Sequence, residues 1–163
     1  MAKPIIMLIL IGSVCATLLT LGDQFTAQQI TDNRTVRARA LMQDMLSAPL
    51  PPLNDPTAPI IGQCDDWLFV SEAAPGYAGE IAGLGLWHAD GQGLKVRVTS
   101  HRETPGIGDF IDHIRTPWIT RWDGGNIQAW TSIDTVSGAT ITSDAVRQLA
   151  LQIFQQVEKH CAR

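Results

Sequence analysis

The pattern of hydrophobic and polar positions begins with a long apolar run at residues 5–22, which read IIMLILIGSVCATLLTLG. A helix of about 18 residues spans roughly 27 Å, which is close to the thickness of a bilayer core. No clear small-residue cleavage site follows the run, and Val14 precedes Cys15 where a lipoprotein signal has a small residue. The pattern therefore favours a retained transmembrane anchor, residues 1–22, over a cleaved signal peptide.

Two further segments separate this anchor from the rest of the chain. Residues 23–47 carry a partial stripe of apolar side chains at helical spacing, which predicts a membrane-proximal helix. Residues 49–59 contain five prolines, and each proline fixes φ and removes a backbone donor. We therefore expect residues 23–59 to form a helix and a stiff linker, and residues 60–163 to form the folded domain.

The remaining chain has the periodicity of short strands followed by a helix. We expect strands at residues 67–70, 81–88, 94–99 and 127–133. The tetrapeptide Asp90-Gly91-Gln92-Gly93 is typical of a hairpin turn between the second and third of these. An apolar stripe predicts a closing helix at about residues 143–160. Since the order is not a regular βαβ alternation, the pattern predicts an α+β fold with a small, mostly antiparallel sheet and packed helices.

The strand expected at residues 94–99 has a regular alternation of side chains. Val96 and Val98 alternate with Lys95, Arg97 and Thr99. Successive side chains of a strand point to opposite faces of the sheet. The alternation therefore predicts one buried face and one face in contact with water.

Composition narrows the class of protein. The chain has 163 residues, enough for one modest domain, and 17% of them are charged, which is low for a soluble protein and agrees with a segment in lipid. The net charge is −4 and Lys and Arg form no run, so we expect no nucleic-acid partner. The four histidines are scattered and no CxxC pair occurs, so the sequence predicts no metal site.

Orientation bears on the cysteines. Charges flank the anchor on both sides and do not decide its direction, but a short tail before it and a large domain after it fit an N-inside arrangement. Cys64 and Cys161 then lie outside the cytoplasm, where a disulfide persists, and we expect them to pair. Two unrelated buried thiols are the alternative. Cys15 lies within the anchor.

The chemically informative stretch is DTVSGATITS at residues 134–143, between a predicted strand and the closing helix. Gly138 and Ala139 leave the backbone open to a bulky group. The free N–H groups and positive dipole end of a helix stabilise a phosphate, and Thr140 offers a hydroxyl for esterification. We expect Thr142 or Ser143 to cap the helix. An ordinary turn and cap without a ligand is the alternative.

A resemblance to a known family changes that balance. Ser137-Gly138-Ala139-Thr140, with Asp134 before and Thr142 after, resembles the flavinylation motif D-x-x-S-G-A-T-x-T. This motif marks the FMN-binding domain of the G subunit of the Rnf ferredoxin:NAD oxidoreductase and of the C subunit of the sodium-translocating NADH:quinone reductase. The resemblance implies a covalent FMN whose phosphate is esterified to Thr140 by a flavin transferase. It also implies that Ser137, Gly138 and Ala139 shape the cofactor loop and that the transferase recognises Asp134 and Thr142.

A second segment, residues 101–109, resembles the family pattern H-x-E-T-P-G-L-G-D, with Ile107 in place of Leu. Read from the residues alone, it is a rigid turn that exposes backbone N–H groups to a flavin edge, or a plain turn. The resemblance implies that it borders the flavin ring through Glu103, Thr104, Pro105, Gly106, Ile107 and Gly108. A third segment, at residues 76–81, is similar to the family's G-Y-G-G-x-I, and the three matches occur in family order.

The resemblance implies a membrane-anchored electron-transfer subunit with FMN in an Rnf-type complex. We expect it in the bacterial inner membrane, held by residues 5–22, with its C-terminal domain in the periplasm and the other subunits as partners. Rnf is favoured over the quinone reductase because the chain is short and its anchor is single. The quinone-reductase homologue, another FMN-domain carrier, and a structural assembly module without flavin are the alternatives.

Two expectations concern what the chain does not do by itself. The sequence brings no nucleophile, base and orienting group together, so we expect a redox subunit without a complete active site. Four tryptophans could stack on a flavin, but core or interface packing is the commoner role for such side chains: Trp87, Trp118, Trp122 and Trp130. For Trp118 and Trp122, contact with the membrane or with a neighbouring protein of the complex is the further alternative.

Overall fold

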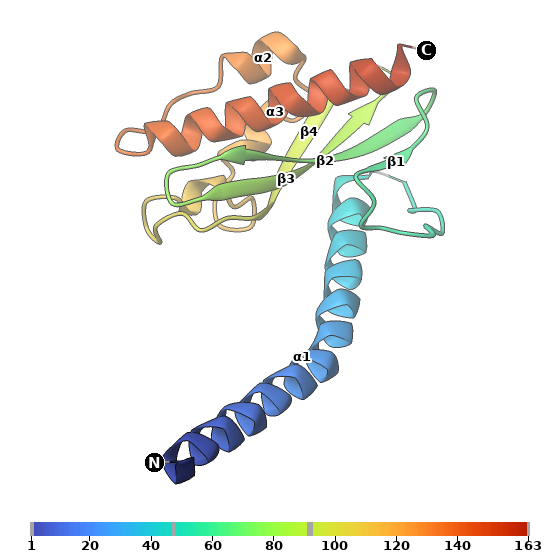
Figure 1. Cartoon of the computed structure of the whole chain (residues 1–163). Coiled ribbons are helices and arrows are strands. Elements are labelled where there is room, and N and C mark those ends of the chain that lie inside the picture. The colour runs from blue at the N-terminus through green and yellow to red at the C-terminus, as the bar shows by residue number, and fades with distance from the viewer. Residues whose placement is uncertain (1, 47, 91–92, 163) are drawn as a thin grey trace. The chain divides into compact units, whose positions relative to one another are not determined.

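The computed structural model describes residues 2–46, 48–90 and 93–162 (Figure 1). The chain divides into two compact units. Residues up to Leu41 together with Asp55–Thr57 form the first, and Met42–Asn54 together with the chain from Ala58 onward form the second. The division expected at residues 22 and 59 stays a prediction.

The first unit is dominated by helix α1, Ala2–Met45. The apolar run and the polar stretch after it form one uninterrupted helix, which continues through Gly22 and Asp23 although both residues are common at helix ends. From Lys3 to Met45 the helix is long and apolar enough, by length and composition, to cross a membrane. The side chains of Ile5–Ile11 are exposed, as a segment in lipid requires.

The second unit is built on an antiparallel sheet with strand order β1-β2-β3-β4. Its strands are β1 (Ile60–Gly62), β2 (Trp67–Pro75), β3 (Glu80–His88) and β4 (Gly93–Ser100). The expected α+β fold with an antiparallel sheet is confirmed, although β2 runs beyond Val70 and the sequence pattern does not predict β1. Of the expected hairpin turn between β3 and β4, residues 91 and 92 lie outside the described residues.

The strand expected at residues 127–133 is wrong. The segment is a short helix, α2 (Ile127–Thr131), which begins after Asn126. The Asn126 side chain accepts a hydrogen bond of 3.0 Å from the Ala129 N–H, the usual way in which asparagine starts a helix. The indole N–H of Trp130 donates to the Leu94 carbonyl at 3.2 Å, so the short apolar run packs on the sheet as a helix. A run of this length fits either structure on hydrophobicity alone.

Helix α3 (Thr140–Cys161) lies across one face of the sheet (Figure 1). Glycines on β3 make room for it. A Cβ on Gly83 would stand 2.4 Å from a methyl carbon of Leu149, and one on Gly85 would stand 2.5 Å from Ile153. The helix therefore packs almost directly on the strand backbone, and its buried stripe forms the main core with the inward residues of β2 and β4.

The prediction that Arg97 faces water is wrong. Its side chain is 6% exposed, and its guanidinium donates to both carboxylate oxygens of Asp123 at 2.7 and 2.6 Å. Asp123 follows the short helix η2 (Ile119–Trp122), which packs against β4. On the same strand, Lys95 donates to the Met45 carbonyl at 3.0 Å. The loop after η2 and the end of α1 thus cover Arg97 and part of Lys95 on the face that alternation alone assigned to solvent, and Thr99 stays exposed.

A disulfide joins Cys64, between β1 and β2, to Cys161 at the end of α3. Cys15 is a free, exposed cysteine of α1. The tryptophans expected to pack in the core do so: Trp118 and Trp130 are buried, and Trp87 and Trp122 pack partly buried against the same core.

Candidate functional site

The three sequence segments that resemble the flavin-domain family meet at one end of the sheet. Figure 1 shows the turn from β2 to β3 and the start of α3 at this end. Glu103, in the loop after β4, connects them. Its Oε1 accepts from the Ala78 N–H at 3.0 Å, and its Oε2 accepts a short hydrogen bond from the Thr142 hydroxyl. We refer to these loops and the first turn of α3 as the loop cluster: residues 76–79, 101–108 and 134–142.

Glycines shape the space around Glu103. A Cβ on Gly76 would lie 2.6 Å from Glu103 Oε1, and one on Gly108 would lie 2.3 Å from Glu103 Cβ. The Glu103 N–H donates to Nδ1 of His101 at 3.2 Å. A carboxylate enclosed in this way stays in place only because its oxygens find donors.

The turn that follows Glu103 is closed by hydrogen bonds between its own residues. Gly106 has φ +83°, a conformation that favours glycine. Its N–H donates to Asp109 Oδ2 at 3.0 Å, and the N–H groups of Ile107 and Gly108 donate to the Thr104 carbonyl at 3.1 and 2.8 Å. These three N–H groups therefore have acceptors within the turn, as in the alternative of a plain turn, and a contact between this segment and the flavin ring stays a prediction. The turn presents the Ile107 side chain, which is 55% exposed.

Thr140 is the first residue of α3, and its side chain is exposed. Gly138, with φ +82°, has no atom within 4 Å of where a Cβ would lie, so the approach to Thr140 is open. The N-cap is Ala139, which provides no side-chain cap. No described residue accepts a hydrogen bond from the N–H groups of Thr140, Ile141 or Thr142. A hydroxyl thus stands beside free donors at the positive end of a helix.

The expectation that Thr142 or Ser143 caps α3 is wrong. Both lie inside the helix, which begins three residues earlier than predicted. The Ser143 hydroxyl donates to the Ala139 carbonyl at 3.0 Å and accepts from the Val136 N–H at 3.1 Å. The Thr142 hydroxyl donates to Glu103. Because both hydroxyls are occupied inside the protein, neither is left to close the helix end.

The residues of the loop cluster fit FMN in charge and in shape. A phosphate matches the free N–H groups at the start of α3 and the positive end of its dipole. An apolar ring matches exposed side chains that come from each of the three segments: Tyr77, Ile107 and Ile141. Most of the other positions expected at the site are exposed: Thr104, Pro105, Asp134 and Ser137. Glu103, Gly108 and Ala139 are buried.

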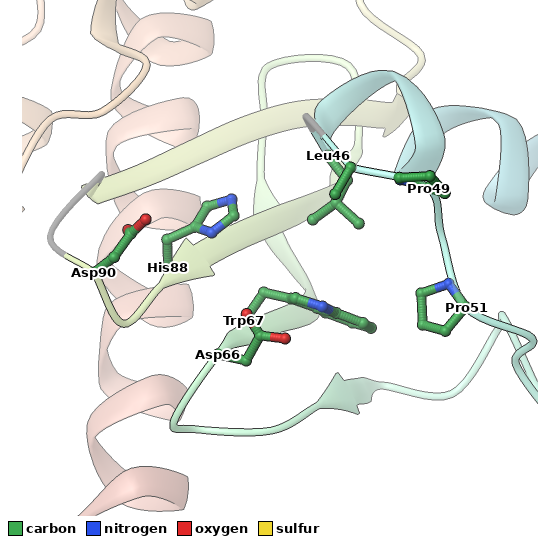
Figure 2. A pocket seen from close by; sticks show the side chains of 8 residues that line it. Leu46, Pro49, Pro51, Asp66, Trp67, His88 and Asp90 are labelled. Carbon is green, nitrogen blue, oxygen red and sulfur yellow. The ribbon is translucent and has the colours of Figure 1, made fainter.

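A separate hollow of about 470 Å³ lies at the other end of the sheet. Figure 2 shows it between the segment after α1, with Leu46 and Pro51, and the ends of β2 and β3, with Trp67 and His88. Trp67 pairs with His88, and Pro75 pairs with Glu80. Eight steps of about 3.3 Å along β2 put the hollow roughly 26 Å from the loop cluster. It is therefore not part of the same site.

Comparison with known proteins agrees with this site. Residues 76–155 match the model of the FMN-binding domain family, a range that holds the whole loop cluster. The G subunit of the ion-translocating oxidoreductase complex of Stutzerimonas stutzeri is 32% identical over 89% of this chain and 77% of the relative. The same protein of Pseudomonas aeruginosa strain UCBPP-PA14 is 30% identical over 90% of the chain and 83% of the relative. The chain belongs to the G-subunit family of Rnf ion-translocating oxidoreductases.

This family membership confirms the family expected from the three motifs. A third relative, from Pectobacterium atrosepticum, is 41% identical over 47% of the chain and 42% of its own length, and it has the same name. The apolar helix α1 and a family of membrane-complex subunits together indicate an inner membrane protein with other subunits as partners.

Sequence reasoning located Thr140 but missed the contacts that hold its helix. Glu103 and Thr142 are 39 positions apart, and no local pattern links them. The local sequence feature that points to this contact is the Glu103 carboxylate in a glycine-rich turn. That feature fits a hydrogen bond to another part of the protein as well as a contact with a cofactor. Ile141 was missed because it points out of a helix start that was predicted three residues too late.

Proposed function

We propose that this member of the Rnf G-subunit family is an electron-transfer protein that carries FMN covalently, through a phosphoester to the hydroxyl of Thr140. The observation that carries the proposal is the position of Thr140, exposed at an uncapped helix start inside an FMN-binding domain. The flavin supplies the redox chemistry, and the chain positions it within the complex.

The attachment step requires an exposed nucleophilic oxygen and stabilised phosphate charge. A flavin transferase acting with FAD and magnesium forms the bond from Thr140 Oγ1 to the FMN phosphorus. The pyrophosphate bond of FAD breaks, AMP leaves, and the hydroxyl proton passes to solvent. The free N–H groups after Ala139 would stabilise the charge of the resulting phosphate. Asp134, exposed before the turn, is the residue that we assign to transferase recognition.

The remaining cluster residues hold and shield the flavin. Tyr77, Ile107 and Ile141 offer apolar surface to the ring, and burial of that surface favours an ordered cofactor. Gly138, at φ +82°, lets the chain turn just before the helix start, where the N–H groups would hold the phosphate. With the ring held in this way, the domain passes electrons between FMN and neighbouring carriers of the complex.

We assign the second unit to the periplasm. The disulfide between Cys64 and Cys161 supports this side, because disulfides persist outside the cytoplasm and are reduced within it. A covalent tether also suits a compartment in which free FMN is scarce, since a dissociated cofactor would be lost.

The test is flavin fluorescence in a denaturing gel after coexpression with a flavin transferase. The full chain should fluoresce, Thr140→Ala should lose the signal, and Thr140→Ser should retain part of it because it keeps a hydroxyl. Thr135→Ala is the matched control, an exposed threonine of the same segment, and should fluoresce like the parent. Fluorescence that persists in Thr140→Ala would contradict the assignment, and a parent chain without flavin would favour a structural module.

A further inference from the structure

We propose that Glu103 is a positioning residue that holds the start of α3 in the geometry needed for flavin attachment at Thr140, an inference that rests on the proposed function. The geometry consists of two hydrogen bonds to one carboxylate, from the Thr142 hydroxyl and from the Ala78 N–H. We refer to this pair of bonds as the Glu103 latch.

Burial makes the latch strong. Glu103 is 6% exposed and Thr142 is 3% exposed, so water does not replace a lost partner at either end. Hydrogen bonds to a charged group contribute more than those between neutral groups, and a buried carboxylate oxygen left unpaired is destabilising. The close approach of Gly76 and Gly108 leaves Glu103 little room to move.

The latch acts on Thr140 through the first turn of α3. Thr142 is two residues beyond Thr140 in the same turn, so fixing the Thr142 side chain fixes the rotation of that turn. The direction of the Thr140 hydroxyl and of the free N–H groups follows from it. The other bond ties the loop that carries exposed Tyr77 to the same carboxylate. One residue therefore sets the position of the ester oxygen relative to the apolar surface.

Two roles for Thr142 give different results. If the transferase recognises Thr142 directly, the contribution of Thr142 to flavin attachment does not depend on Glu103. If Thr142 acts through the latch, loss of either partner has the same consequence, and loss of both adds nothing more. The buried position of Thr142 favours the latch.

The experiment measures the initial rate of flavin attachment to the full chain with purified transferase, FAD and magnesium. We expect Thr142→Val, which keeps the shape of the side chain, to slow attachment about tenfold, the factor expected from one hydrogen bond to a charged group. Glu103→Ala should slow it at least as much. The double variant should be no slower than the slower single variant.

Conservative variants separate the latch from a general loss of structure. Thr142→Ser keeps the donor. Glu103→Gln keeps an acceptor for the Ala78 N–H and an amide that donates to the Thr142 hydroxyl, but it loses the negative charge. Thr142→Ser should attach flavin within about twofold of the parent, and the rate of Glu103→Gln should lie between those of the parent and Glu103→Ala. Thr99→Val and Glu80→Ala make the same chemical changes at exposed positions and should leave the rate unchanged.

A second readout is the fluorescence anisotropy of the attached flavin, which should fall in Thr142→Val because the first turn is less constrained. Attachment at the parental rate in Thr142→Val, or rate effects that multiply in the double variant, would overturn the latch while leaving Thr140 as the flavin site. A parent chain that takes up no flavin would instead overturn the proposed function. If Glu103→Ala does not fold, Thr142→Val and Glu103→Gln still decide between these results.

Discussion

Three glycines of the loop cluster hold backbone conformations that other residues rarely adopt: Gly79, Gly106 and Gly138. Gly106 and Gly138 have φ +83° and +82°, with open space where a Cβ would lie. Gly106→Ala and Gly138→Ala should each lower the free energy of unfolding by about 1 kcal/mol, from backbone strain alone. Urea unfolding of the detergent-solubilised chain, followed by tryptophan fluorescence, measures this. Gly22→Ala in α1 is the control and should not change domain unfolding; stabilisation by Gly138→Ala would contradict the backbone geometry.

At the residue scale, the sequence identified the candidate attachment residue, Thr140, but not the contacts of the residues that stabilise the fold around it. Thr140 could be singled out because its neighbours in sequence form a recognisable motif. The roles of Thr142 and Arg97 could not, because their partners lie 39 and 26 positions away. A hydroxyl next to a helix start predicts a cap, and a charged residue in an alternating strand predicts exposure. Only the fold reveals that Glu103 and Asp123 take those side chains inward.

At the scale of elements, the ion pair between Arg97 and Asp123 joins β4 to the loop after η2. Its side chains are 8% and 24% exposed. Asp123→Ala should lower the free energy of unfolding by about 3 kcal/mol, because it leaves a buried guanidinium without its bidentate partner. Thermal unfolding of the solubilised chain, followed by near-ultraviolet circular dichroism, measures the loss.

The surface pair of Arg147 with Asp144 provides the control for that prediction. The Asp144 side chain is 44% exposed, so Asp144→Ala should lower the free energy of unfolding by less than about 1 kcal/mol. Equal losses in the two variants would show that the link from β4 to the η2 loop does not contribute more than a solvent-exposed pair.

The sequence predicted the elements whose segments are long enough to show a repeating pattern, and it failed for the short segments. Strands β3 and β4 and most of α3 follow from clear alternation or a helical stripe. Strand β1 has three residues, too few to show alternation. The segment 127–131 was predicted as a strand because so short an apolar run shows no repeat that distinguishes a strand from a helix. It is a helix in the structure, and the Asn126 side chain caps its first turn.

At the scale of the whole molecule, the disulfide closes a loop with a sequence separation of 97. Because a cross-link of that length removes much of the freedom of the unfolded chain, the pair should stabilise the domain by about 4 to 5 kcal/mol. The double variant Cys64→Ser with Cys161→Ser should therefore melt at a clearly lower temperature. Cys15→Ser is the control and should melt like the parent. A parent chain whose melting temperature does not change on reduction would contradict the prediction.

The central claim is a phosphoester between FMN and Thr140, and intact mass spectrometry tests it most directly. Full chain purified from cells that contain a flavin transferase should weigh more than its sequence by the mass of FMN less one water. Fragmentation should place that increment on the peptide that holds Thr140. A chain of unmodified mass from such cells, or the increment on any other peptide, would contradict the account.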